Sequence, residues 1–423
     1  MNSGLNIIRL RMALVVSAIL LAVFPVGAAN GLSGRWDATV MAGKAEVPFR
    51  FEIVQDGDKV QGFFFEGERK IGSTSGSFQN GTLVLGYDFL NTTLEATLNG
   101  DQLQGTYRNN RPNAHPMEFR AQRHAPPAAG AASSPAVAGD WAMYRTAPDN
   151  SKLDVSWRLY LRQSGTEVSG AILKTSGDTG TLTGTWRDGK LTMSHFAGER
   201  PILVEVQMNP DDTLSLKVDG QFTYRASRIT ETHAKGIPDP PDPSQFTSVK
   251  DPNEPFHFTG LTLDGKMLSD KDPMFQGKVV LLSIGGSWCP NCLDEAPLLV
   301  DFYKKYHSRG LEVVGLNFEV DPDFEAARPR VATFIKRFSI EYPIVVLGTP
   351  DDVAAKLPQL VNFGVYPTTI FLGRDGRVRR IHAGFASLAT GEEHVRLQKE
   401  MAELIETLLA EKPQQMSGSI RTQ

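Results

Sequence analysis

S-W-C-P-N-C at residues 287–292 contains the only two cysteines of the 423-residue chain, Cys289 and Cys292, and it follows the run K-V-V-L-L-S-I at 278–284. A continuous apolar run of this length predicts a strand that is buried on both faces. Beyond the cysteines, apolar side chains recur at helical spacing, at Ala296, Leu299, Val300 and Tyr303. The stretch therefore predicts a buried strand that leads through the two cysteines into a helix.

The start of a helix suits a reactive cysteine. A thiolate is the nucleophile in disulfide exchange, and a thiol with an ordinary pKa is mostly protonated at neutral pH. Free backbone N–H groups and the helix dipole favour the anion at a helix N-terminus. We expect Cys289 to cap this helix and Pro290 to take its first position, where a missing N–H is harmless. Cys292 follows almost one turn later, so Cys289 can attack a disulfide and Cys292 can resolve the mixed disulfide.

Strands and helices alternate through the rest of this C-terminal region. Apolar runs predict further strands at 311–318, 342–347, 368–372 and 378–382. Helices are expected around 331–338 and in a last amphipathic segment through Leu397, Met401, Leu404, Ile405 and Leu408. This alternation predicts a mixed α/β sheet that helices cover on both faces.

Four motifs give this region a family resemblance. W-C-P-N-C after a buried strand, E-A-P at 295–297, V-V-G-L-N-F at 313–318 and Y-P-T-T-I-F-L-G-R-D-G at 366–376 occur in this order. Together they resemble the exported TlpA/ResA-type thiol-disulfide oxidoreductases, which have a thioredoxin fold. The resemblance covers about residues 250–412, and it implies a redox-active dithiol with neither a further cofactor nor a metal.

The resemblance also implies roles for single residues. Pro367 should be a cis-proline that faces the cysteines, beside backbone that receives the substrate in extended form. Glu295 matches the acidic residue that these reductases place beneath the inner cysteine, Cys292. Burial near a thiol would raise the pKa of this carboxyl, which suits a proton acceptor and donor. The substrate groove is expected to be formed by Trp288, Pro290, Tyr366 and Thr368.

The chain departs from the family pattern at two places. Gly285 and Gly286 stand where the family commonly has an aromatic residue, and we expect them to widen the groove beside Trp288. Pro290 and Asn291, the two residues between the cysteines, match neither the pair found in typical reductants nor the pair found in the strong periplasmic oxidant. Reduction is favoured by resemblance alone, and an oxidase or isomerase stays open.

The region before residue 233 contains two similar units. R-F-E-I-V-Q-D-G-D-K-V-Q-G at 50–62 matches R-L-Y-L-R-Q-S-G-T-E-V-S-G at 158–170, and Asn80-Gly81 matches Asp188-Gly189. Such dipeptides favour hairpin turns because they accept positive φ angles. A tandem duplication therefore predicts two antiparallel all-β modules, each a small barrel or sandwich.

The N-terminus has the pattern of an export signal. Arg9 and Arg11 precede an apolar run at 12–26, and small residues follow it. We expect a signal peptide, or an uncleaved anchor, over residues 1–29. The expected order is then module 1 (30–124), a linker (125–138), module 2 (139–232), a proline-rich linker (233–249), the thioredoxin-like domain (250–412) and a tail (413–423).

Composition limits the function. Forty-four basic and 48 acidic side chains give a net charge of −4, which argues against a nucleic-acid partner. Two cysteines are too few for a disulfide-stapled scaffold or a four-cysteine zinc site. We expect a periplasmic or extracytoplasmic enzyme that acts on protein disulfides with a membrane or periplasmic electron donor. The alternative is a binding protein whose β modules capture a ligand or partner.

Overall fold

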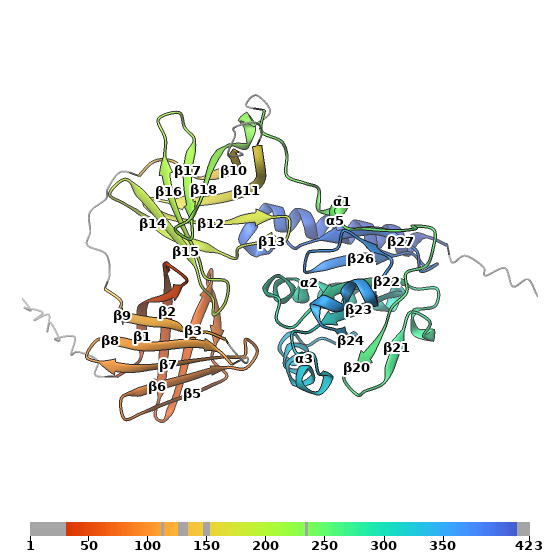
Figure 1. The fold of residues 1–423 in the computed structure, drawn as a ribbon, viewed down its shortest axis with the longest axis horizontal. Helices are drawn as coiled ribbons and strands as arrows, with labels where there is room; N and C mark the ends of the chain where they lie inside the picture. The colour runs from red at the N-terminus through yellow and green to blue at the C-terminus, as the bar shows by residue number, and fades with distance from the viewer. Residues whose placement is uncertain (1–30, 111–113, 126–133, 147–152, 233–235, 413–423) are drawn as a thin grey trace, which may run out of the picture.

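The computed structural model describes residues 31–110, 114–125, 134–146, 153–232 and 236–412. The expected signal peptide and C-terminal tail lie outside these residues. Within them the chain forms two β modules and an α/β domain (Figure 1). None of the helices in these ranges is long and apolar enough to cross a membrane.

Module 1 is one antiparallel sheet in the order β4-β3-β2-β1-β9-β8-β7-β6-β5. Its strands are β1 (Gly34–Ala42), β2 (Ala45–Asp56), β3 (Lys59–Glu66), β4 (Arg69–Gly72), β5 (Ser75–Gln79), β6 (Thr82–Tyr87), β7 (Thr92–Asn99), β8 (Gln102–Asn109) and β9 (Met117–Arg123). The sheet curls until β3 contacts β5, so the module is barrel-like.

Module 2 repeats this strand order. Its strands are β10 (Gly139–Thr146), β11 (Leu153–Ser164), β12 (Glu167–Lys174), β13 (Gly177–Asp178), β14 (Leu182–Arg187), β15 (Lys190–His195), β16 (Ile202–Met208), β17 (Leu214–Val218) and β18 (Phe222–Arg228). Here β12 pairs with both β11 and β14, which closes the barrel. The prediction of antiparallel all-β modules is confirmed.

Equivalent tryptophans show the duplication in detail. Trp36 and Trp141 are both fully buried near the start of their modules. The indole of Trp36 donates to the carbonyl of Leu32 at 3.1 Å, and that of Trp141 donates to Val137 at 2.9 Å. Each indole N–H is therefore satisfied by the same local hydrogen bond, as buried indole N–H groups require.

The two β modules share part of a core. The loop between β15 and β16 carries Phe196 into module 1, where its ring lies 4.8 Å from Phe49 and 5.3 Å from Phe64. The hydroxyl of Tyr107 donates to the carbonyl of Gly198 in the same loop at 2.7 Å. This loop is the main apolar link between the modules.

The C-terminal domain has a seven-stranded mixed sheet in the order β21-β20-β24-β23-β22-β26-β27. The strands of this sheet are β20 (Thr259–Thr262), β21 (Met267–Ser269), β22 (Val279–Gly285), β23 (Leu311–Phe318), β24 (Ile344–Gly348), β26 (Thr368–Leu372) and β27 (Val378–Ala383). A separate two-stranded sheet consists of β19 (Ser248–Val249) and β25 (Leu360–Val361). The helices of the domain are α1 (Pro243–Phe246), α2 (Pro290–Tyr306), α3 (Phe324–Phe338), α4 (Val353–Lys356) and α5 (Glu392–Ala410). β22, β23 and β24 are parallel, and the mixed sheet is confirmed.

Both faces of this sheet are buried. Leu281 on β22 packs in a core with side chains of α2, α3 and α5, whereas Leu282 packs with Val353 of α4 on the other face. The segment 233–249, expected as a spacer, contributes structure as well, since α1 lies in it and β19 pairs with β25.

Candidate redox site

Cys289 caps helix α2, as the sequence predicts. Its Sγ accepts a hydrogen bond from the backbone N–H of Cys292 at 3.3 Å, and Pro290 is the first helical residue. A disulfide joins the two cysteines, whose Cα atoms are 5.2 Å apart. Only 3% of Cys289 and 5% of Cys292 is exposed. The strand-to-helix junction therefore holds Cys289 where the helix N-terminus favours a thiolate.

Glu295 is buried one turn after Cys292, with 1% of its surface exposed. The hydroxyl of Ser283 on β22 donates to its carboxyl at 2.7 Å, and that of Thr369 on β26 donates at 2.5 Å. Burial raises the pKa of Glu295 to about 7, although both hydrogen bonds act in the opposite direction. An exposed, solvated helix position is thereby excluded for this residue.

The peptide bond between Tyr366 and Pro367 is cis. Pro367 precedes β26, and β26 pairs with β22, the strand that leads to the cysteines. The carbonyl of Pro367 accepts a hydrogen bond from the N–H of Gly384 at 2.7 Å. The Tyr366 ring lies 5.4 Å from the ring of Trp288, edge to face. The neighbouring Thr368 is buried. The structure thus brings Tyr366 next to Trp288, the residue before Cys289, and pairs Thr368 with Ile284 near the end of β22.

The expectation that two glycines widen the groove is wrong at Gly286. A Cβ atom there would collide with the indole of Trp288 and the carbonyl of Phe318. The indole N–H donates to this same carbonyl at 2.8 Å. Gly286 therefore makes room for the tryptophan ring, which fills the space that the glycine leaves.

Residues of module 2 reach the start of α2, and sequence reasoning missed them. Arg200 donates to the side-chain oxygen of Asn291, between the two cysteines, at 2.6 Å. It also pairs with Asp294 at 3.1 Å, and the Asn291 amide donates to the carbonyl of Ser176 at 2.7 Å. Figure 1 shows β12 and β13 extending toward α2 and α5. No sequence pattern marks these residues, because the contact joins segments about 90 positions apart.

Asp294 lies in a buried cluster of charges next to the dithiol. Its side chain is 10% exposed and faces Arg200 and, at 3.6 Å, Arg69 of module 1. Burial raises the pKa of Asp294 to about 6, against the influence of these two guanidinium groups, and the carboxyls of Glu66 and Asp178 raise it further. The cluster joins all three parts of the chain.

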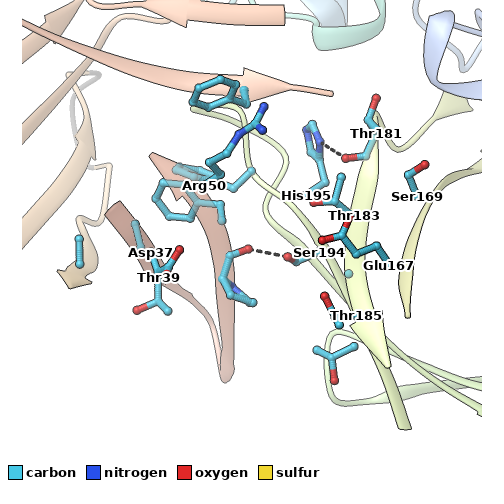
Figure 2. A pocket seen from close by; sticks show the side chains of 18 of the residues that line it. Asp37, Thr39, Arg50, Glu167, Ser169, Thr181, Thr183, Thr185, Ser194 and His195 are labelled. Atoms are coloured by element: carbon cyan, nitrogen blue, oxygen red, sulfur yellow. Dashed lines mark hydrogen bonds between the residues drawn. The ribbon is translucent and has the colours of Figure 1, made fainter. Parts of the chain in front are cut away.

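A large cavity lies elsewhere, between the two β modules (Figure 2). Its volume is about 1360 Å³, and neither cysteine lines it. Its labelled side chains are polar or charged, namely Asp37, Thr39, Arg50, Glu167, Ser169, Thr181, Thr183, Thr185, Ser194 and His195. Ligand capture by the β modules stays a prediction. Among the described residues, no group of three or more His, Cys, Asp or Glu side chains could hold a metal ion.

Comparisons with known proteins agree on the C-terminal domain. Residues 245–393 match the Redoxin family. A thiol-disulfide oxidoreductase ResA of Bacillus cereus is 29% identical over 122 residues, 29% of this chain and 63% of that protein. ResA of Halalkalibacterium halodurans is 26% identical over 140 residues, 33% of this chain and 72% of that protein. The chain thus spans less than two thirds of the Bacillus cereus relative.

A solved thiol:disulfide interchange protein of the thioredoxin family from Chlorobium tepidum TLS is 24% identical. The alignment covers 38% of this chain and 99% of that one, with a TM-score of 0.30. The Redoxin match, the ResA relatives and the position of the two cysteines agree on the same region. The C-terminal part of this chain is therefore a thioredoxin-like domain of the TlpA/ResA type.

Proposed function

We propose that this protein is an exported thiol-disulfide oxidoreductase that reduces disulfide bonds in extracytoplasmic proteins. The observation that carries the proposal is Cys289 at the N-cap of α2, with Cys292 hydrogen-bonded to it and Glu295 buried one turn further on. A dithiol at a helix start with a buried acid beside it is suited to exchange thiols and disulfides.

The reaction starts from the reduced dithiol. The Cys289 thiolate attacks one sulfur of the substrate disulfide, the substrate S–S bond breaks, and the departing sulfur takes up a proton. Cys292 then gives its proton to the carboxylate of Glu295 and attacks the Sγ atom of Cys289. The S–S bond to the substrate breaks, and the second substrate sulfur leaves and takes up the proton from Glu295, so two electrons have passed to the substrate and a Cys289–Cys292 disulfide remains. A dithiol donor in the membrane or periplasm reduces this disulfide again.

Substituting the two cysteines in turn tests the roles. The full chain should reduce insulin with dithiothreitol as electron source, and Cys289→Ser should lose this activity. Cys292→Ser is the matched variant, because it keeps the nucleophile and should accumulate mixed disulfides that Cys289→Ser does not form. An active Cys289→Ser variant would refute the proposal.

The reduction potential of the Cys289–Cys292 pair tests whether the protein acts as a reductant or as an oxidase. A value below about −220 mV, measured against glutathione, is expected for a reductant, whereas a value near −120 mV is typical of an oxidase. The second result would replace reduction by oxidation and leave the two cysteine roles in place.

A further inference from the structure

The turn between β12 and β13 lies against the redox domain beside the dithiol. Asp178 accepts hydrogen bonds from the backbone N–H of Ser387 at 2.5 Å and from its hydroxyl at 3.0 Å. A Cβ atom at Gly177 would collide with the side chain of Asn291 and the carbonyl of Phe385. The backbone of this turn therefore lies in close contact with both the C-x-x-C motif and the segment after β27.

That segment borders the predicted substrate groove. Gly384 donates from its backbone to Pro367, the cis-proline that is expected to face the cysteines, at 2.7 Å. A Cβ atom at Gly384 would collide with the carbonyl of Thr175 in the same turn of module 2. One flank of the groove is thus occupied by the chain itself, whereas Trp288 and Tyr366 on another flank are only half-buried.

Arg200 fastens module 2 at this place. Its guanidinium bonds Asn291 at 2.6 Å and Asp294 at 3.1 Å, both near the N-terminus of α2. Its backbone has a φ of +51°, a region that side chains other than glycine rarely adopt. Hydrogen bonds of a charged group to partly buried partners are among the stronger ones in proteins. The contact is therefore well suited to hold the turn on the groove.

We propose that module 2 selects the substrates of the redox site. The turn at 175–178 occupies one flank of the groove, and Arg200 is the positioning residue that keeps it there. In this arrangement Cys289 is only 3% exposed. The site then favours disulfides on small molecules or on flexible, extended segments, and it reacts more slowly with disulfides that lie on a folded protein surface. This inference rests on the proposed function, since it concerns the substrates of the same dithiol.

Thiol access can be measured without turnover. In the Cys292→Ser background Cys289 is the only thiol of the chain. Its second-order rate is measured with N-ethylmaleimide and with a polyethylene-glycol maleimide, which share one chemistry and differ in size. Arg200→Met should speed the bulky reagent about tenfold relative to the small one, because losing a charged hydrogen bond shifts the open population by this order.

Two further variants separate a loss of the positioning contact from general damage to the fold. Asp178→Ala removes the independent contact with Ser387 and should raise the same ratio, and Arg200→Lys should restore part of the selectivity. Arg225→Met, an arginine of the same module that pairs with Asp211, is the matched control and should leave the ratio unchanged. An unchanged ratio in both Arg200→Met and Asp178→Ala, or a parallel rise for both reagents, would overturn the inference.

Enzymatic assays separate this inference from the proposed function. In the chain with both cysteines, Arg200→Met should raise the rate on insulin relative to that on oxidised glutathione. If the maleimide ratio rises but no variant reduces any disulfide, the proposed function fails and the steric role of module 2 stands. If disulfides are reduced but the ratio never changes, the function stands and the role of module 2 fails.

Discussion

The properties of Glu295 depend on both its position in the sequence and its surroundings in the fold. Its spacing from Cys292 follows from the helix and could be predicted from the sequence. Its hydrogen-bond partners could not, because Thr369 lies on β26, far along the chain, and Ser283 lies on the strand before the motif. These two hydroxyls satisfy the carboxyl in a buried site, so that its pKa is set by burial.

Glu295→Gln should slow insulin reduction by about a hundredfold, since a positioned proton acceptor contributes at least this much in many enzymes. In the native protein the rate should rise with pH through about 7, as Glu295 becomes the ionised acceptor for the Cys292 proton. The glutamine variant should lose this dependence. Steady-state rates between about pH 5 and 9 would show both effects.

The same carboxyl should also affect stability. Its folded pKa of about 7 lies above the ordinary value of 4.5, so the folded state holds its proton more tightly. This contribution is complete below pH 4.5 and is lost as pH rises through about 7. Glu341→Gln, an exposed carboxyl, is the control. The free energy of unfolding is measured as a function of pH. An identical pH dependence for Glu295→Gln and the native protein would contradict the assigned role.

At the scale of elements, local sequence signals were the most reliable. Asn80-Gly81 and Asp188-Gly189 form the expected hairpin turns, with positive φ at all four residues. The buried strand β22 and the cap of α2 also follow from nearby residues. By contrast, the loop between β15 and β16 carries no such signal, because its shape depends on module 1, into which it inserts.

Gly198 in this loop provides a test of the junction between the modules. It has a φ of +91°, and a Cβ atom there would meet Leu90, Tyr107 and Phe64 of module 1. Gly198→Ala should lower the free energy of unfolding by about 3 kcal/mol, from backbone strain together with overpacking. Urea unfolding of the full chain measures this change.

Gly189 is the matched control, since it has a φ of +77° and open space around its Cα. Gly189→Ala should cost about 1 kcal/mol, from backbone strain alone. Equal losses for the two variants would mean that the loop does not pack into module 1 as described.

At the scale of the whole molecule, three modules could be predicted, but their arrangement could not. Repeats and linkers are visible in one sequence, whereas docking depends on pairs of residues that no pattern connects. Arg337 of α3 lies 3.6 Å from the ring of Phe89 in module 1, and Arg200 joins module 2 to α2. Such contacts place charged groups between the modules, where burial changes their pKa values.

Glu199 makes this junction sensitive to pH. Burial raises the pKa of Glu199 to about 7, against the charges of Arg200 and Arg337, and the carboxyls of Asp294 and Glu66 raise it further. Because the folded pKa is above the ordinary 4.5, docking is favoured by the protonated form and loses this stabilisation as pH rises through about 7. The segment 175–200 should therefore open more often at about pH 8 than at about pH 5.

Hydrogen exchange of the segment 175–200 measures this opening, once rates are corrected for the intrinsic effect of pH on exchange. Glu199→Gln, which cannot ionise, should keep similar protection at both pH values. Glu167→Gln, an exposed carboxyl of the same module, should retain the pH dependence of the native chain. If Glu199→Gln behaves like the native protein, another group controls the junction. If it does not, the protonation of Glu199 controls how often the segment 175–200 opens beside the redox domain.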